Sequence, residues 1–504
     1  MKFFPTARIK EIDQYTIDHE PVLSINLMER AAKACTRWII NNLPPETEFL
    51  IFCGPGNNGG DGLAIARQLA DEDFSVKVAI LRFTEKVSDD FAMNLKRLDK
   101  YNQVDIFEIK NKADFPEIKR DNVLIDGIFG SGLTRPAEGL PGEIISLINQ
   151  TGNTVVAIDI PSGLFGEDNS RNPYETVIKA TYTLSFQFPK QAFFYRENAP
   201  YTGDWHVLPI GLHPKAIEEI HSDLYHVTPG FVKSMLKQRD KYSHKGNYGH
   251  ALLIAGSYGM MGAAVLATKA CLRTGVGLVT THVPRKGCDI IQVAVPEALV
   301  SIDESEIVFA KLPDLSKYTA IGIGPALTKK NNCRDAFKHL IGKTEVPLVI
   351  DADGLNILSE NNDWLADLPP NAILTPHPKE FERLAGEYNN AYQRNQAQIE
   401  FSKKYNVIVV LKGANTSISL PDGRCFYNTT GNPGMATGGS GDVLTGMILS
   451  LLAQGYQTWQ AAILATYLHG MAGDFAAAEK GEEAMIPGDI IDFIGNAFKS
   501  LKCS

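Results

Sequence analysis

The sequence predicts two α/β domains on one chain, each built around a mostly parallel sheet. The chain has 504 residues, which is enough for two or three domains. Hydrophobic residues make up 44% of it and charged residues 21%, so it can fill packed cores and is neither disordered nor fibrous. Short β-branched runs alternate with helical patterns along most of the chain, as they do in βαβ units.

The first half begins with an amphipathic helix and then alternates between strands and helices. Ser24 can cap a helix over residues 24–40, in which apolar residues recur at three- and four-residue steps. The strands expected after it are residues 48–53, 76–81, 123–126 and 155–159, and the expected helices are residues 63–70, 89–98 and 144–149. This alternation predicts a doubly wound parallel sheet.

A domain boundary is expected near residues 209–222, where prolines, a glycine and several charges interrupt the alternation. We therefore expect one domain over residues 1–217 and a second over residues 225–504. The strands expected in the second domain are residues 251–255, 276–283, 320–323, 348–351, 373–375 and 407–411, and its clearest helices are residues 262–273 and 440–452.

Charge and cysteine content exclude several classes of function. Lys and Arg number 49 against 58 Asp and Glu, and a net charge of −9 has the wrong sign for binding nucleic acid or an anionic membrane. Seven scattered cysteines without a Cys-x-x-Cys pair argue against a disulfide framework and a zinc site. No signal peptide or membrane-length apolar run is found, so a cytoplasmic protein is expected. The apolar stripe of its first helix suggests a homo-oligomer.

A glycine-rich turn, residues 53–62, follows the strand 48–53 and leads into a helix. Gly54, Gly56 and Gly59 satisfy the pattern G-x-G-x-x-G, and the helix N-terminus behind such a turn can bind an anion. One interpretation is therefore an NADP-binding site, with Arg82 at the end of the next strand. This interpretation leaves the polar run in the same turn unexplained.

Two further strands end in polar turns, at Asp126 and at Asp159. Ligands of an open parallel sheet lie outside the carboxyl ends of its strands, so Asn58, Asp126 and Asp159 are expected to converge on one crevice. A structural interpretation, in which each Asp only caps its own turn, stays open. Oxygens of Asn58, Asp126 and Ser162 would suit a hard cation, and the single carboxylate among them favours a monovalent one.

Over roughly residues 1–217 these motifs resemble the NAD(P)H-hydrate epimerase domain. The resemblance rests on residues 27–29, 57–62, 126–132 and 159–163. It implies a Rossmann-like fold, catalysis by Asp159, and interconversion of the R and S epimers of hydrated NADH or NADPH. It also implies a potassium ion held by Asn58, Asp126 and Ser162. The residues that it implies for substrate binding are Asn57, Asn58, Gly59, Gly60, Asp61, Gly130, Ser131, Gly132, Leu133, Thr134, Arg135, Pro136 and Asp159.

The second half carries a glycine-rich stretch, residues 431–442, that ends in Asp442 at the start of an apolar helix. Flexible glycines before a helix create an anion site, here with a carboxylate beside it. An Asp in the first turn of a helix is also an ordinary residue that the helix dipole stabilises. Upstream, Lys412 follows a strand and could bind phosphate or be a solvated turn residue.

Two more turns of the second half are candidates for substrate contacts. Residues 256–262 form a glycine-rich turn between a strand and a helix, where small residues would let a flat ring approach the backbone. His377 lies between two prolines after a strand, and its imidazole is expected to point into the same cleft. As a lone histidine it can also be a structural hydrogen-bonding residue.

This second set resembles the ADP-dependent NAD(P)H-hydrate dehydratase, a ribokinase-like α/β enzyme, over roughly residues 225–504. The match rests on residues 256–264, 351–355, 375–378, 412–413 and 439–442. The family commonly has Gly-Pro-Gly where this chain has Gly-Pro-Ala at residues 324–326, which puts the contacts of that loop in doubt. The resemblance implies ADP binding, with magnesium, by Lys412, Gly413, Ala414, Asn415, Thr416 and Gly441, and contacts to the hydrated nicotinamide by Ala263, Gly324, His377 and the catalytic Asp442.

Together the two resemblances imply a bifunctional isomerase and lyase that repairs the hydrated cofactor. The epimerase would supply the one epimer that the dehydratase accepts, and Asp442 would deprotonate the hydroxyl that receives phosphate from ADP. The sequence does not decide between ADP and ATP. The alternative is a ribokinase-like small-molecule kinase with a non-catalytic N-terminal nucleotide-binding module, because such kinases also place an Asp after a glycine-rich anion site.

Overall fold

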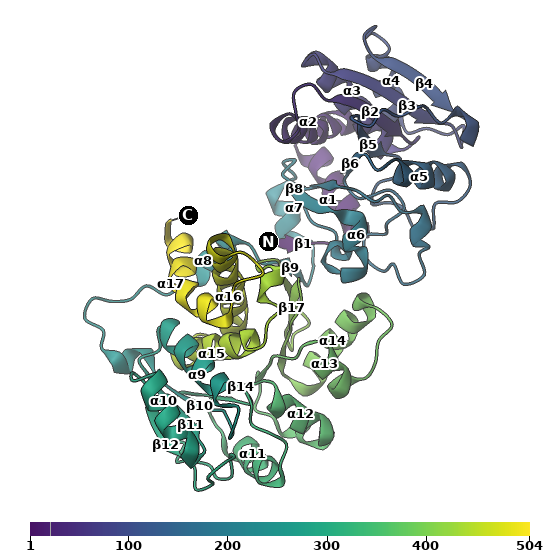
Figure 1. Ribbon diagram of the computed structural model, residues 1–504. Coiled ribbons are helices and arrows are strands. Elements are labelled where there is room, and N and C mark those ends of the chain that lie inside the picture. The colour runs from purple at the N-terminus through teal and green to yellow at the C-terminus, as the bar shows by residue number, and fades with distance from the viewer. Residues whose placement is uncertain (21, 504) are drawn as a thin grey trace. The chain divides into compact units, whose positions relative to one another are not determined.

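The computed structural model describes residues 1–20 and 22–503 and divides the chain into two compact units (Figure 1). One unit contains Lys2–Ser222 together with Asn390–Tyr392, and the other contains Met1, Asp223–Asn389 and the chain from Gln393 to the C-terminus. In the part of the chain that is described, no helix is long and apolar enough to cross a lipid bilayer.

The N-terminal unit is built around a parallel sheet with the strand order β4-β3-β2-β5-β6-β7-β8. The order reverses between β2 and β5, so the loops after these two strands flank the switch point at which such sheets bind ligands. The elements of this unit are β1 (Lys2–Phe3), α1 (Thr6–His19), α2 (Ser24–Asn42), β2 (Glu48–Cys53), α3 (Asn57–Asp71), β3 (Ser75–Leu81), α4 (Asp89–Leu98), β4 (Asp105–Ile109), β5 (Val123–Gly127), α5 (Leu140–Thr151), β6 (Thr154–Ile158), β7 (Tyr182–Phe186), α6 (Ala199–Thr202), β8 (Asp204–Leu208) and α7 (Pro214–Glu219).

Both faces of this sheet are covered by helices, as a doubly wound fold requires. Alternate residues of β2 point to opposite cores: Phe49 and Ile51 join the core under α2, α3 and α4. Leu50 and Phe52 join the core under α5. The sheet therefore lies between two hydrophobic layers, and its carboxyl edge stays available for a site.

The helix α3 begins earlier than the sequence predicts. We expected a turn up to Gly62 and a helix from residue 63, but the helix starts at Asn57 and includes three glycines. Packing offsets their low helix propensity: a Cβ on Gly59 would lie 1.8 Å from the carbonyl oxygen of Gly54, and one on Gly62 would lie 2.8 Å from the sulfur of Cys53. These glycines let the helix pack closely against the turn and strand before it.

The C-terminal unit has a mixed sheet with the order β9-β18-β17-β16-β15-β14-β13-β10-β11-β12, in which only the pairs β16/β17 and β17/β18 are antiparallel. Its elements are β9 (Leu224–His226), α8 (Pro229–Met235), β10 (His250–Ile254), α9 (Met261–Arg273), β11 (Leu278–Val283), α10 (Cys288–Ala294), β12 (Leu299–Ile302), β13 (Ala320–Ile323), α11 (Asn331–Lys343), β14 (Leu348–Ile350), α12 (Asp353–Glu360), β15 (Ile373–Leu374), α13 (Pro378–Ala385), α14 (Ala391–Tyr405), β16 (Ile408–Leu411), β17 (Thr416–Ser419), β18 (Cys425–Asn428), α15 (Ser440–Ala453), α16 (Thr458–Lys480) and α17 (Pro487–Cys503).

Two cores again lie on opposite faces of the sheet. Residues of α9, α15, α16 and α17 pack with Ala251 and Leu253 of β10. Residues of α11, α12 and α13 pack with the alternate residues Leu252 and Ile254. The predicted fold class, two α/β domains with mostly parallel sheets, is confirmed.

Candidate functional site

A cavity of about 760 Å³ lies at the carboxyl edge of the N-terminal sheet, at the switch point between β2 and β5. Its walls include one face of α1, one face of α2 and the loops after β2, β5 and β6. Most of the residues predicted to bind substrate line it: Asn57, Asn58, Asp61, Gly130, Ser131, Gly132, Leu133 and Asp159. Gly59, Gly60, Thr134, Arg135 and Pro136 are not part of its lining.

Asp159 directly follows β6 and is held in an unusual backbone conformation, with φ of +66°. Its carboxylate accepts a hydrogen bond from the ammonium of Lys190 at 2.6 Å and one from the backbone N–H of Phe186 at 3.3 Å. Burial would raise the pKa of Asp159, but the charge and hydrogen bond of Lys190 bring that pKa below its ordinary value. The side chain is therefore ionised at neutral pH and faces the cavity.

Lys190 was missed by the sequence analysis. Its side chain is only 2% exposed, and besides Asp159 it donates to the hydroxyl of Ser185 at 3.0 Å. A buried lysine needs a charged partner, and here the partner comes from a strand end 31 residues earlier. Nothing in the sequence around this lysine indicates a partner so far away, so the ion pair becomes visible only in the folded structure.

The three predicted potassium ligands meet around the backbone of Phe129. The hydroxyl of Ser162 donates to a carboxylate oxygen of Asp126 at 2.6 Å, and the backbone N–H of Ser162 donates to the other oxygen at 2.7 Å. The carbonyl oxygen of Phe129 accepts hydrogen bonds from the Asn58 amide at 2.9 Å and from the Ser162 hydroxyl at 3.1 Å. The structure thus gathers amide, hydroxyl, carboxylate and carbonyl oxygens in one place.

Asp126 carries a charge that no cationic side chain balances among the residues described. It is 1% exposed, and its partners are Ser162 and the backbone N–H of Ile128. Burial raises the pKa of Asp126 to about 6, while these hydrogen bonds lower it. A cation held by this oxygen-rich group would offset the cost of the buried carboxylate.

In the C-terminal unit two residues of the matching motifs lie at the carboxyl ends of parallel strands on either side of β15. Asp351 follows β14 and Lys412 follows β16, and their side chains form an ion pair of 2.8 Å. The other carboxylate oxygen of Asp351 accepts a hydrogen bond from the hydroxyl of Thr445 at 2.7 Å. The sequence analysis named Lys412 as a candidate phosphate ligand and included Asp351 only within a matching motif, and it did not predict that they pair.

The glycine-rich stretch brings α15 against this ion pair. A Cβ on Gly441 would lie 3.3 Å from the Lys412 ammonium and 3.7 Å from an oxygen of Asp351. Asp442 follows in the first turn of α15, where burial and the charge of Asp351 raise its pKa to about 6 and Lys412 opposes them. A helix N-terminus, an ammonium and a titrating carboxyl therefore share one place, as an anion-binding site with an adjacent base requires.

The loop after β13 approaches the same strand ends closely. Gly324 has φ of +131°, and a Cβ there would lie 1.8 Å from the carbonyl oxygen of Asp351. Ala326, the residue that departs from the family pattern, adopts φ of +53° without glycine. On the other side the N–H of Gly256 donates to the carbonyl oxygen of Pro325 at 2.9 Å, which links this loop to the turn that leads to Ala263.

His377 is a helix cap. Its Nδ1 accepts a hydrogen bond from the N–H of Glu380 at 3.2 Å, and the Glu380 carboxylate accepts one from the N–H of His377 at 2.8 Å. This reciprocal pair begins α13. The Nδ1 atom is thus occupied, and the Nε2 atom of the half-exposed ring lies 3.4 Å from a carboxylate oxygen of Glu380. Within the protein, His377 therefore acts as a structural hydrogen-bonding residue.

The predicted nucleotide segment forms the turn between β16 and β17. It contains Lys412, Gly413, Ala414, Asn415 and Thr416. The hydroxyl of Thr416 donates to the carbonyl oxygen of Gly413 at 3.1 Å and accepts from its N–H at 3.3 Å. Lys412 is the member whose ammonium reaches the ion pair described above.

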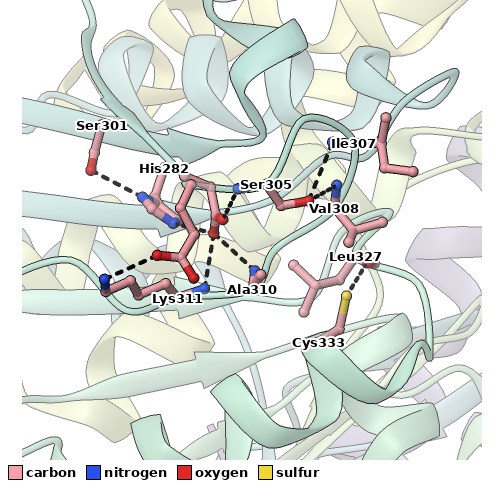
Figure 2. Close-up of polar contacts among 11 residues, drawn as sticks. His282, Ser301, Ser305, Ile307, Val308, Ala310, Lys311, Leu327 and Cys333 are labelled. Atoms are coloured by element: carbon pink, nitrogen blue, oxygen red, sulfur yellow. Dashed lines mark hydrogen bonds and ion pairs between the residues drawn. The ribbon is translucent and has the colours of Figure 1, made fainter.

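Asp303, which the sequence analysis did not single out, organises a loop beside the turn 256–262. Its carboxylate is buried and accepts hydrogen bonds from His282 and from the N–H groups of Ser305, Ala310 and Lys311. Figure 2 shows His282 between Ser301 and this loop. The carbonyl oxygen of Ile307 in the loop accepts a hydrogen bond from the N–H of Tyr258 at 2.9 Å. Asp303 therefore stabilises the turn indirectly, through the loop that it organises.

Comparisons with known proteins match both halves of the chain. The NAD(P)H-hydrate dehydratase family matches residues 251–496, and the family described as YjeF-related protein N-terminus matches residues 24–192. A solved structure titled ADP/ATP-dependent NAD(P)H-hydrate dehydratase, from Bacillus subtilis, is 33% identical and covers 54% of this chain and 97% of its own, with a TM-score of 0.49.

Full-length relatives carry the assignment further. The bifunctional NAD(P)H-hydrate repair enzyme Nnr of Moorella thermoacetica is 36% identical over all of this chain and 97% of the relative. The enzyme of the same name from Thermofilum pendens is 33% identical, with the same coverage. Both resemblances found in the sequence are thereby confirmed, and the chain belongs to the family of bifunctional NAD(P)H-hydrate repair enzymes.

Proposed function

We propose that this chain repairs hydrated NADH and NADPH with two activities. Residues 1–217 would interconvert the R and S epimers, and residues 225–504 would dehydrate the S epimer with ADP. The proposal is carried by one observation. At the strand ends of both sites, an aspartate and a lysine form an ion pair, and one member of each pair is a predicted functional residue. In the N-terminal unit this pair is Lys190 with Asp159, and in the C-terminal unit it is Lys412 with Asp351.

In the epimerase site, Asp159 would act as general base toward the water that adds at the hydroxyl-bearing carbon of the hydrated ring. Its carboxylate lines the cavity and is kept ionised by Lys190, which suits a general base. The loop Gly130–Leu133 and the start of α3 would surround the substrate, because their residues line the same cavity. The N-terminus of α3 favours the negative charge of the dinucleotide phosphates.

Potassium fits the oxygen-rich group at Phe129. Asn58, Asp126 and Ser162 would hold it, together with backbone carbonyls, and one carboxylate among neutral oxygens suits a monovalent cation. Such an ion would neutralise Asp126 and fix the loop after β5 against the substrate. The residues themselves already tie that loop to the turn after β6 through Ser162.

In the dehydratase site, Asp442 would take the proton of the substrate hydroxyl. The hydroxyl oxygen would then attack the terminal phosphorus of ADP, AMP would leave, and loss of phosphate with a proton from the neighbouring carbon would restore the ring double bond. Lys412 and the N–H groups at the start of α15 would stabilise the phosphoryl group during transfer. Ala263, Gly324 and His377 would contact the nicotinamide.

Magnesium would enter this site with the nucleotide. Within the described residues no group of three or more His, Cys, Asp or Glu side chains is placed to hold a metal ion. Magnesium is commonly held by substrate phosphates with one or two carboxylates, and Asp351 and Asp442 are the carboxylates beside the predicted phosphate position. This arrangement fits a metal that is bound mainly by ADP.

The test follows the two epimers separately. Purified protein with the S epimer and ADP should regain the absorbance of the reduced nicotinamide, and the R epimer should be repaired faster than it epimerises without enzyme. Asp442→Asn should lose dehydration and keep epimerisation, and Asp159→Asn should do the reverse. Wild-type protein that instead phosphorylates a vitamin or a sugar alcohol would favour the kinase alternative.

A further inference from the structure

The helix α1 forms a wall of the epimerase cavity and brings a third acidic residue to it. Ile9, Lys10, Asp13, Gln14 and Ile17 all line the cavity, and their spacing of three and four residues places them on one face of the helix. Asp13 therefore belongs to the same cavity as Asp61 and Asp159, although it is distant from both in sequence. No motif of the sequence analysis includes it.

Asp13 differs from the other acids of α1 in having no polar partner among the residues described. Glu11 is exposed and paired with Arg8 at 2.9 Å, and Asp18 accepts a hydrogen bond from Gln14. Asp13 is partly buried and forms neither an ion pair nor a side-chain hydrogen bond within that part of the chain. An unpaired carboxyl aimed into a cavity is unusual unless it serves a ligand.

The surroundings shift the pKa values of Asp13 and Asp159 in opposite directions. Burial and the charge of Asp159 raise the pKa of Asp13 to about 6, and Lys190 opposes them. Asp61 is more deeply buried, and burial together with its acidic neighbours raises its pKa. The titratable and charged groups that face Asp13 and Asp61 are Lys10, Cys35, Asp90, Asp159 and Lys190.

We propose that Asp13 is a second catalytic residue of the epimerase, the acid that complements the base Asp159. This inference rests on the proposed function and names the proton donor within the same site. Acid and base catalysis by two groups works best when their environments drive their protonation apart, and a group that titrates near the working pH transfers protons most effectively.

The reaction balances with water as the only other reactant. Asp13 donates its proton to the hydroxyl on C6, the bond between C6 and oxygen breaks, and water leaves while the ring nitrogen lone pair forms a double bond to C6. A water molecule then adds to the opposite face of C6 and gives its proton to Asp159. The two carboxyls exchange the proton through solvent before the next turnover, and the reverse reaction uses them in opposite roles.

The decisive variant is Asp13→Asn, which keeps the size of the side chain and removes its acidic proton. Epimerisation should fall by about 10²- to 10⁴-fold in kcat, with little change in KM. The wild-type profile of kcat/KM should decline as pH rises through about 6, and this decline should be absent from the variant. Glu11→Gln removes the same charge from the exposed side of α1 and should leave both rate and profile unchanged.

Two further measurements separate acid catalysis from a structural role. Asp13→Ala should regain activity when formic acid is added, because a small acid can occupy the vacated space. Epimerisation in water labelled with heavy oxygen should place the labelled oxygen in the hydroxyl group on C6. An Asp13→Asn enzyme that keeps wild-type turnover or the wild-type decline with pH overturns the proposal, and so does epimerisation without label. Wild-type protein that does not accelerate epimerisation at all contradicts the proposed function instead.

Discussion

Replacing Lys190 by Met tests whether a buried lysine keeps the epimerase base ionised. The pair is short, at 2.6 Å, and the side chains of Lys190 and Asp159 are 2% and 11% exposed. Breaking a buried pair by removing one partner costs about 3 to 5 kcal/mol, because the other charge stays buried without compensation. For a unit of this size that loss lowers the thermal midpoint by about 6 to 20 °C.

The variant should also change the pH dependence of epimerisation. In the wild type the pKa of Asp159 is lowered, so its ionised form stabilises the fold above the pKa of the unfolded chain, and this stability is lost as pH falls through the lower folded value. Without Lys190, burial raises the pKa of Asp159. The acid limb of the kcat/KM profile should then move to higher pH.

The assay is epimerisation from about pH 3 to about pH 8, a range that includes the acid limb of Asp159 and the decline near the pKa of Asp13, together with thermal unfolding of the full chain. Lys179→Met is the matched control, because Lys179 lies in the same unit and its side chain is exposed. The control should keep the wild-type midpoint and profile. If Lys190→Met does the same, the ion pair neither stabilises the unit nor ionises Asp159, and the reasoning is refuted.

Three other substitutions test the remaining sites. Asp442→Asn should slow dehydration of the S epimer by about 10²- to 10⁴-fold and leave ADP binding, measured by calorimetry, unchanged; a variant with full turnover would remove Asp442 as the base. Asp126→Asn should weaken the dependence of epimerisation on potassium, and an unaltered potassium titration would contradict the proposed ligand set. Asp303→Ala should remove the acceptor of His282 and of three backbone N–H groups and lower the free energy of unfolding by about 3 kcal/mol. Amide exchange in the loop 303–311 should become faster, and unchanged exchange would show that Asp303 does not stabilise the loop.

The strand ends of both sites could be predicted because their signals are local. In each case a β-branched run ends in glycine and polar residues within a few positions, and the parallel order of the strands then brings the ends to one edge. The structure places Asn58, Asp126 and Ser162 around Phe129 in this way. The sequence did not show that α3 already begins at Asn57, because the contacts that favour this start are made with residues before the helix.

The pairing partners could not be predicted because they depend on tertiary contacts. Lys190 and Asp159 are 31 residues apart, and Lys412 and Asp351 are 61 apart. Asp13 lies on a helix that the periodicity of the first residues did not reveal, and its role depends on which face of that helix covers the cavity. Burial and charge pairing across long separations leave no periodic pattern in a single sequence.

The two sites have the same electrostatic arrangement, but the proposed mechanisms use it for opposite proton transfers. Each pairs one aspartate with a lysine, Asp159 at 2.6 Å and Asp351 at 2.8 Å, and each leaves a second carboxyl, Asp13 or Asp442, with a pKa of about 6. If Asp442 is the base of dehydration, the rate of that step should rise as pH increases through 6, and if Asp13 is the acid of epimerisation, that step should decline over the same range. Repair of the R epimer, which requires both steps, should therefore be limited by dehydration at low pH and by epimerisation at high pH. Accumulation of the S epimer below the crossover and of the R epimer above it would reveal the two regimes, and a single limiting step at all pH values would contradict the assignment of the two carboxyls.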